Sequence, residues 1–224
     1  MGERWIPRVF LLQFLKGVPR TILYEFCEYL PAEEGDGAYG LVAVPNATDP
    51  TILVPKPAYY SLQQLIGLLS DPGNTFTPTS RTYNITTNSS ALQHLLMQKR
   101  DGSIFLALWV ELPIWNPNGG VGGIGGYNPP IAAAEVSFSL LLGTQSYLAT
   151  ATQHTLNGYG DLINSTVLFS AEAVNGTTVA KLGCFVTDTV SVLEITPSAA
   201  SSTSSTLPLQ SFVIVLRLFL SGSD

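Results

Sequence analysis

The first apolar residues of the chain recur every three or four positions, which is the period of an α-helix. They are Ile6, Phe10, Leu11, Phe14 and Leu15. Gly17 and Pro19 follow directly and are residues that end helices. The pattern therefore predicts a short amphipathic helix over residues 6–16.

The next segment, residues 21–29, carries apolar side chains at both odd and even positions. A strand with two apolar faces is typical of a buried parallel sheet. A long connection with glycine, proline and acidic residues follows, and a second helical pattern begins at Lys56-Pro57 and ends at Asp71-Pro72-Gly73. Residues 1–72 are thus predicted to form a small α/β part, in the order helix, strand, long loop, helix.

From residue 73 the pattern changes to short runs with strand character, separated by turn residues. Arg100-Asp101-Gly102, between the runs 91–99 and 103–112, is an Asp-Gly hairpin signal. Further strands are predicted at residues 135–142, 146–153, 166–173 and 186–195. This spacing is typical of an antiparallel β-sandwich, so we expect a mostly β protein with a sandwich domain over residues 73–195.

Residues 196–224 are predicted to lie outside the sandwich, as a Ser/Thr-rich linker and an apolar tail. The small residues at 198–202, a polar spacer and the apolar run 207–220 resemble the signal for a glycosylphosphatidylinositol anchor. Arg217 interrupts that run, and its 14 residues are fewer than the about 20 that a membrane span needs. A lipid anchor through this tail, and a linker with an extra strand or helix packed on the domain, both stay open.

Composition narrows the function classes. Of the 224 residues, 46% are hydrophobic and 12% are charged, so the chain can bury a core and disorder is not expected. The net charge of -6, with ten Lys and Arg residues, argues against a nucleic-acid partner, because such partners need a basic surface.

Five Asn-x-Ser/Thr sequons indicate passage through a secretory pathway. Their acceptors are Asn46, Asn84, Asn88, Asn164 and Asn175. The alternative is that a Thr-rich composition produces them by accident. The first residues lack the charged start, apolar run and cleavage site of a signal peptide, which suggests a truncated N-terminus. We therefore expect a secreted or cell-surface location through a longer parent protein.

Cofactor and metal chemistry is not predicted. Cys27 and Cys184 are too few for a disulfide framework, and we expect them to be small buried apolar residues. His94 and His154 are sixty positions apart and have no cysteine nearby, so no metal-ligand spacing exists. Neither histidine has an evident partner and no serine lies in a nucleophile elbow, which disfavours a Ser-His-Asp hydrolase.

Three segments occur in an order that resembles a known family. They are residues 20–26 (RTILYEF), 56–62 (KPAYYSL) and 98–109 (QKRDGSIFLALW). Together they resemble the C-terminal part of secreted glycoside-hydrolase-like proteins built from a (β/α)8 barrel and a β-sandwich. The run 190–195 resembles the closing strand of that sandwich, and the resemblance covers roughly residues 5 to 195.

The resemblance implies that residues 1–72 are the C-terminal end of an incomplete barrel, with its last strand and flanking helices. Such hydrolases resemble the retaining type, whose two catalytic Glu residues end the fourth and seventh strands, and these would precede Met1. The chemistry needs both carboxyl groups about 5 Å apart, so no catalytic residue is predicted here. One strand cannot close a barrel, so residues 1–72 should expose apolar surface unless a missing barrel segment or a partner covers it.

By the same resemblance, Tyr24, Glu25 and Glu28 could border a sugar subsite in a complete protein. Three positions apart on a strand, the two glutamates would point to opposite faces and cannot form a close pair. The structural alternative is one polar residue in the barrel interior and one solvated charge at the loop edge. Trp115 is a further candidate for stacking on sugar, whereas Trp109 lies in an apolar run and is expected in the core.

The sequence thus predicts a C-terminal fragment of a glycoside-hydrolase-like protein without catalysis of its own. The alternative is a non-enzymatic β-sandwich module that binds glycans or packs against another protein. A carbohydrate partner is compatible with both hypotheses.

Overall fold

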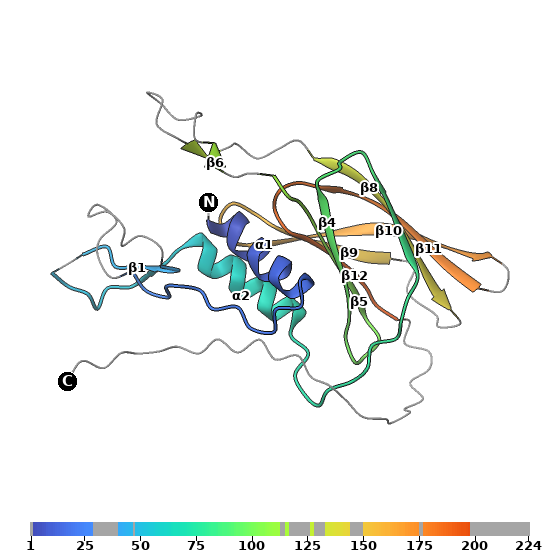
Figure 1. The fold of residues 1–224 in the computed structure, drawn as a ribbon, viewed down its shortest axis with the longest axis horizontal. Coiled ribbons are helices and arrows are strands. Elements are labelled where there is room, and N and C mark those ends of the chain that lie inside the picture. Colours follow the sequence, from blue (N-terminus) through green and yellow to red (C-terminus); the bar gives the residue numbers. More distant parts are fainter. Residues whose placement is uncertain are drawn as a thin grey trace. The chain divides into compact units, whose positions relative to one another are not determined.

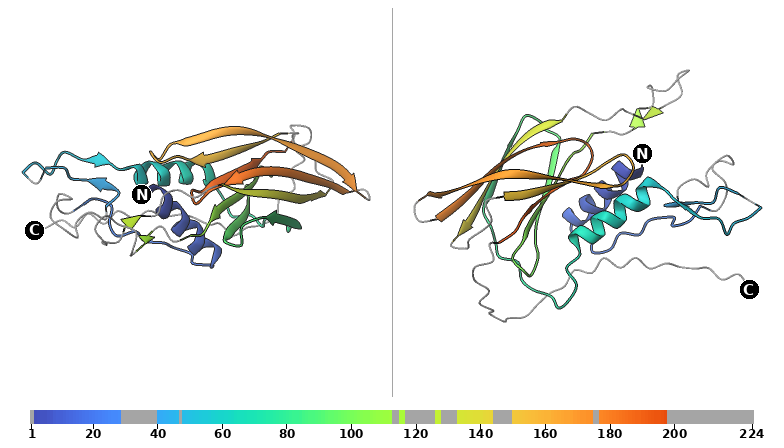
Figure 2. Two further views of the ribbon diagram at one scale, coloured as in Figure 1. Left: turned by 90° about the horizontal axis from the view of Figure 1, so that it is seen from above. Right: turned by 180° about the vertical axis from the view of Figure 1, so that it is seen from behind.

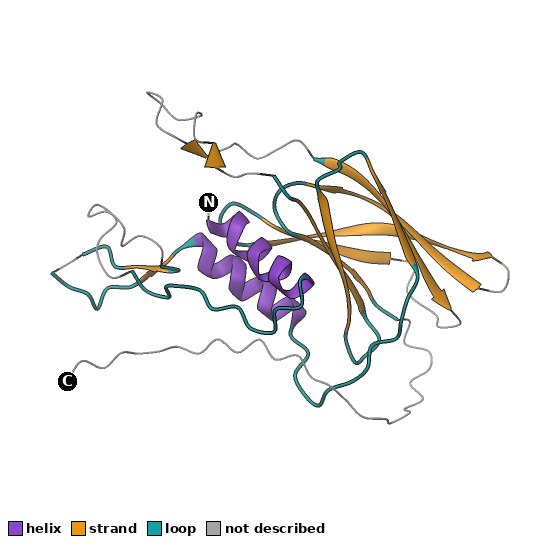
Figure 3. Cartoon of the chain, viewed as in Figure 1, coloured by secondary structure: helices purple, strands orange, loops and turns teal. Residues whose placement is uncertain are grey.

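The computed structural model describes residues 2–28, 40–46, 48–112, 115–116, 126–127, 133–143, 150–174 and 177–197 (Figure 1). These residues fall into two compact units. The first comprises residues 2–72 with the loop 157–161, and the second comprises residues 73–156 and 162–197. The two α-helices of the described part belong to the first unit, and antiparallel strands dominate the second (Figure 3). The prediction of a mostly β protein is confirmed.

Helix α1 spans Gly2–Leu15 and begins four residues before the predicted start. Its predicted end is confirmed, because Gly17 adopts a φ of 76°. There the Val18 N–H donates to the Gln13 carbonyl at 2.9 Å, and the Gly17 N–H donates to the Phe14 carbonyl at 2.9 Å. These two bonds form a Schellman motif, in which glycine takes the left-handed conformation without a Cβ clash.

The segment predicted as a buried strand over residues 21–29 is different in the structure. A parallel bridge joins Cys27 to Val42, and none of the described residues 21–26 belongs to a strand. Ile22 is 88% exposed and Tyr24 is 79% exposed, so burial on both faces is wrong. A strand needs a neighbour along its length, and the backbone bonds of this segment to residues 41–42 reach only its last four described residues.

Two short strands and a helix complete the first unit. Strand β1 (Val42–Ala43) pairs antiparallel with β2 (Val54–Pro55), and α2 (Pro57–Leu69) follows. The predicted start of α2 is confirmed, because Pro57 stands at the first helical position, where its missing N–H removes no helical bond. The helices and β1 share a small core of buried residues: Ile6, Leu41, Val42, Ala58 and Leu62.

Eight strands of the second unit form one sheet in the order β3-β8-β11-β10-β9-β12-β5-β4. They are β3 (Tyr83–Thr87), β4 (Leu92–Gln98), β5 (Ile104–Val110), β8 (Ala134–Gly143), β9 (Thr150–Leu156), β10 (Leu162–Val174), β11 (Thr177–Val186) and β12 (Ser191–Ile195). Strands β6 (Trp115–Asn116) and β7 (Gly126–Tyr127) pair separately. The long strand β10 joins the two halves of the sheet, since its first half pairs with β9 and its second half with β11.

The predicted Asp-Gly hairpin is confirmed. Strands β4 and β5 pair on either side of it, and Gly102 adopts a φ of 88°. The Asp101 carboxylate accepts a bond from the Ser103 N–H at 2.8 Å, which is the usual reason that aspartate favours a turn. Strand β8 also lies where the sequence predicts it, one residue longer at each end.

Other strand boundaries differ from the prediction. The predicted ranges 146–153, 166–173 and 186–195 correspond to β9, β10 and β12. Strand β12 begins only at Ser191, because the chain turns after β11 at Thr187, whose hydroxyl oxygen accepts a bond from the Thr189 N–H at 3.2 Å. The sequence pattern does not predict strands β3 and β11. Thr in β3, and Thr, Ala and Gly in β11, leave few large apolar residues to mark the alternation.

One hydrophobic core serves the whole eight-stranded sheet. Its largest contributions come from β5, β8, β11 and β12: Ile104, Leu106, Leu108, Val110, Val136, Phe138, Leu140, Leu142, Ala180, Leu182, Cys184, Val186, Leu193 and Ile195. Strands β5 and β8 lie far apart in the strand order, so the sheet curls until both halves face this core (Figure 2). Strand β5 is buried at every position.

The predicted linker and tail lie outside the described residues, apart from residues 196–197. So do the acidic loop residues at 33–36 and most of the glycine-rich stretch at 119–126. Neither α1 nor α2, the helices that the structure describes, is long and apolar enough to cross a membrane.

Candidate functional site

The residues predicted to border a sugar subsite lie on the extended segment that follows α1. Tyr24 is exposed and Glu25 is half-buried, with its carbonyl accepting a bond from the Leu41 N–H at 3.3 Å. Glu28 is 4% exposed. The structure thus places Tyr24 in solvent and Glu28 in the interior of the first unit.

The Glu28 carboxylate bonds to the Lys56 ammonium group. The Glu28 side chain is 1% exposed and that of Lys56 is 27% exposed. Their backbones are also tied to one stretch, because the Glu28 N–H donates to Val42 and the Lys56 N–H donates to Leu41, both at 2.9 Å. Of the two glutamates in the structural alternative, Glu28 is therefore not the solvated loop-edge charge.

This ion pair defines what Glu28 can do. A buried carboxylate is costly unless an opposite charge and hydrogen bonds compensate it, and the lysine supplies both. The pair fastens the segment before β1 to the start of α2. Its carboxylate is engaged by Lys56, so the arrangement holds structure and does not present a free acid or base.

The two tryptophan predictions have different outcomes. Trp109 is fully buried in β5 and its indole N–H donates to the Glu111 carboxylate at 2.6 Å, so the core assignment is confirmed. Trp115 lies in β6, opposite Tyr127 of β7. Its side chain lies outside the described part, and its role in sugar stacking stays a prediction.

A polar cluster that sequence reasoning missed crosses three neighbouring strands. His154 of β9 is 7% exposed. Its Nδ1 lies 2.8 Å from the Asn164 amide oxygen of β10, and its Nε2 lies 2.8 Å from a Glu194 carboxylate oxygen of β12. The expectation that this histidine lacks a partner is wrong.

Both ring nitrogens of His154 are occupied by these two neighbours. A histidine that activates a serine must offer one nitrogen to the hydroxyl, and this ring has neither available. The cluster therefore compensates a buried imidazole and links β10, β9 and β12 through side chains as well as backbone. It does not form a nucleophilic centre.

The sequon acceptors that the structure describes are Asn46, Asn84, Asn88 and Asn164, and all four are exposed. Asn175 lies outside the described residues. At Asn46 the amide oxygen accepts bonds from the Thr48 N–H at 2.9 Å and from the Thr48 hydroxyl at 2.7 Å. Exposure makes these sites available to modification, and glycosylation stays a prediction.

Among the residues that the structure describes, no group of three or more His, Cys, Asp or Glu side chains could hold a metal ion. Cys27 and Cys184 are both free thiols. Cys184 is buried as expected, whereas Cys27 is only partly buried.

Iodoacetamide is expected to alkylate Cys27 well before Cys184. Burial raises the pKa of Cys184 to about 11, so only about 0.1% of this thiol is thiolate at pH 8. As long as the pH is below that pKa, each increase of one pH unit should raise its labelling rate about tenfold, because the thiolate fraction grows by that factor. Timed labelling of the folded protein with peptide mass spectrometry measures both sites. Faster labelling of Cys184 than of Cys27 would contradict the burial of Cys184.

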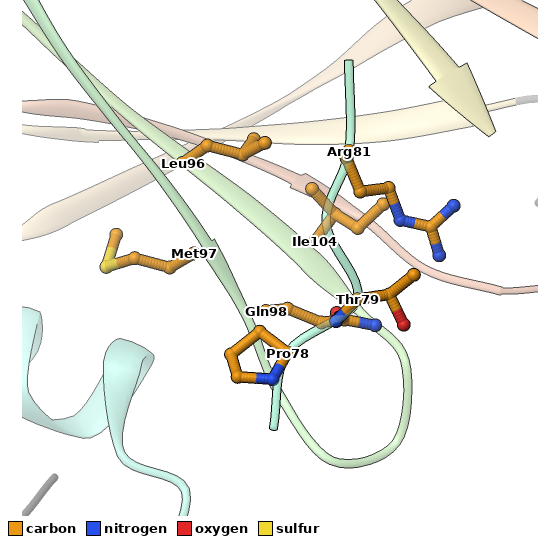
Figure 4. Close-up of a pocket in the computed structure, with 7 residues that line it drawn as sticks. All are labelled: Pro78, Thr79, Arg81, Leu96, Met97, Gln98 and Ile104. Atoms are coloured by element: carbon orange, nitrogen blue, oxygen red, sulfur yellow. The ribbon is translucent and has the colours of Figure 1, made fainter. Parts of the chain in front are cut away.

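A small pocket of about 60 Å³ lies on the second unit, at the end of the β4–β5 hairpin (Figure 4). Its lining residues are Pro78, Thr79, Arg81, Leu96, Met97, Gln98 and Ile104. The Gln98 amide oxygen accepts a bond from the Thr79 N–H at 2.8 Å, which closes one side. Ligand pockets usually enclose about 300–1,000 Å³, so this hollow is too small for a sugar ring.

Comparison with known proteins does not add a family. The chain matches no protein-family model and no curated protein.

Proposed function

We propose that this chain is the non-catalytic C-terminal part of a glycoside-hydrolase-like protein. In this proposal, residues 1–72 complete a (β/α)8 barrel and residues 73–195 form the β-sandwich that accompanies it. Carbohydrate is the substrate class of the whole protein, which passes through the secretory pathway to the outside or the surface of the cell.

The observation that carries the proposal is the exposed apolar surface of the first unit. Ile22 and Tyr24 lie two residues apart on the segment that follows α1, and both side chains are mostly exposed. Other large apolar side chains of this unit that are at least one-third exposed are Trp5, Leu15, Val18, Ile52, Leu53, Val54, Tyr60 and Tyr159. A monomeric domain rarely leaves such a surface uncovered, which supports a missing partner for this segment.

A barrel provides the cover that this segment lacks. Every barrel strand has parallel neighbours on both edges and is packed on both faces. The described segment has one parallel bridge, between Cys27 and Val42. Covering Ile22 alone would contribute about 1.5–3 kcal/mol, so docking the remaining strands against this segment is favourable.

The second unit supports the sandwich part of the proposal. Its antiparallel sheet curls over one core, and β10 passes from one half of the sheet to the other. In a β-sandwich, inner faces of two strand layers interdigitate around a shared core in this way. The exposure of the four described sequon acceptors supports a secretory route.

The state of Glu28 supports a chain without catalysis of its own. Retaining hydrolysis needs a free carboxylate as nucleophile and a second carboxyl group as acid about 5 Å away. Glu28 is engaged by Lys56, and Tyr24 beside Glu25 is open to solvent. In the proposal, both catalytic glutamates belong to the preceding barrel strands.

The test compares the chain with its extended form on a panel of aryl glycosides. The transcript is mapped upstream of the Met1 codon, and the extended protein and this chain are purified in parallel. We expect barrel-encoding sequence in frame, turnover by the extended protein, and none by the chain. Activity of the chain that is lost in Glu25→Gln or Glu28→Gln, but kept in the control Glu135→Gln, would overturn the proposal.

A further inference from the structure

One face of the β3–β8–β11 part of the sheet is directed away from the core and carries one exposed aromatic ring among mostly polar side chains. Leu141 of β8 is a further exposed apolar residue there. Phe185 of β11 is 66% exposed. The strand registers place these residues on its face: Asn84, Thr86, Glu135, Ser137, Ser139, Lys181 and Gly183. The residues that alternate with them, such as Phe138 and Leu182, belong to the core.

The chemistry of this face fits carbohydrate. The C–H face of a sugar ring packs against an aromatic ring, while its hydroxyl groups bond to neighbouring hydroxyl and charged side chains. Gly183 lies two residues from Phe185 on the same face, and a Cβ built there would meet nothing within 4 Å. The surface beside the ring is therefore open, and hydroxyl groups from Ser137 and Thr86 lie in the row that includes Gly183.

The chain carries an attachment point for carbohydrate on this same face. Asn84 is an exposed sequon acceptor that pairs with Ser139, which in turn pairs with Lys181. From Asn84 to Phe185 the sheet is crossed by two strand spacings, about 10 Å, and followed along the strands for four residues, about 14 Å. The diagonal is about 17 Å. A few linked sugar rings span such a length.

We propose that the N-linked glycan of Asn84 lies across the outer face of β3, β8 and β11 and packs on Phe185. The proposal needs secretory modification of this chain, and it is independent of any barrel or hydrolase activity. It gives the exposed ring an occupant that the polypeptide itself carries.

The other described acceptors lie outside the paired strands that join Asn84 to Phe185, although Asn88 follows Thr87, whose partner Val136 adjoins the Glu135–Phe185 pair. Asn88 follows the end of β3, where the chain bends and the Ser89 N–H donates to the Thr87 hydroxyl oxygen at 3.1 Å. Asn164 lies in the half of β10 that pairs with β9, and its amide oxygen is at the His154 ring. Asn84 alone of these acceptors lies within the ladder that leads to Phe185.

The test measures how well this glycan is shielded. The chain is secreted from cells treated with kifunensine, so that every glycan stays of the oligomannose type. Endoglycosidase H then removes glycans from the folded protein, and glycopeptide mass spectrometry follows each site. We expect slow release at Asn84 and an increase of about fivefold in Phe185→Ala, because packing on an aromatic ring is lost.

Two controls make the result specific. Tyr159→Ala removes another exposed aromatic ring and should leave release at Asn84 unchanged. Release at Asn88 should not respond to Phe185→Ala, and a response there in place of Asn84 would overturn the proposal. An unmodified Asn84, or equal release rates with and without Phe185, overturns the proposal. Thr86→Ala removes the sequon of Asn84, so this variant carries no glycan there. If the variant binds free oligomannose and loses that binding when Phe185→Ala is added, the face serves an external glycan and the proposal is overturned.

Discussion

Replacing Phe138 with alanine is expected to lower the free energy of unfolding of the second unit by about 3–5 kcal/mol, the usual cost of removing a buried aromatic ring. Phe138 is 2% exposed and its ring lies 6.0 Å from that of Tyr83. It belongs to β8 and pairs with Ile85 of β3, so the cavity would open between an edge strand and the core. Urea unfolding, followed by the fluorescence of the buried Trp109, measures the change.

Phe185→Ala is the matched control for this prediction, because it removes the same ring from a neighbouring strand. Phe185 lies on the outer face and is mostly exposed, so its loss should change the free energy of unfolding by no more than about 0.5 kcal/mol. Equal effects of the two substitutions would contradict the register of β8 and β11, which assigns Phe138 inward and Phe185 outward.

Replacing Lys56 with methionine is expected to destabilise the first unit by about 3 kcal/mol. The substitution keeps an unbranched side chain, one atom shorter, but leaves the Glu28 carboxylate buried without its cation. Such a loss costs about 3–5 kcal/mol in a fully buried pair. The partial exposure of Lys56 puts the expectation at the low end. Hydrogen exchange of α2 and of residues 41–44, read by mass spectrometry, reports the loss locally.

Adding Glu28→Gln to the Lys56→Met protein should recover part of the lost stability of the first unit, because the double variant has no uncompensated buried charge. Lys16→Met serves as the control, since Lys16 is exposed at the end of α1 and its replacement should leave exchange in α2 unchanged. A Lys56→Met protein that exchanges like the original chain would show that solvent, and not Lys56, compensates Glu28.

Elements with signals inside a few residues could be predicted from the sequence. Pro57 at the start of α2, Gly17 after α1 and the Asp101-Gly102 turn act locally, and each is found where the pattern indicates. Residues 21–29 show the limit of such reasoning. Two apolar faces indicate a strand, but a strand exists only where a neighbour supplies hydrogen bonds, and the sequence pattern does not contain the neighbour.

The candidate site shows the same limit for side chains. His154 and Glu194 are 40 positions apart, and only the pairing of β9 with β12 brings them together. Glu28 and Lys56 are 28 positions apart and belong to different elements. Residue types alone suggested a solvated charge and an unpartnered histidine, because long-range register is not visible in local spacing.

The position of β5 in the sheet has a consequence for synthesis of the chain. One edge of β5 pairs with β4, which precedes it in the chain. The other edge pairs with β12, where Leu193 lies opposite Leu106 and is synthesised 87 residues after it. At about 5–20 residues per second, this interval lasts about 4–17 s on the ribosome. During it, an apolar strand without charge or proline has an open edge, the kind of segment that pairs with other chains. The strand best protected in the finished protein is thus the one most vulnerable to misassembly while the protein is being made.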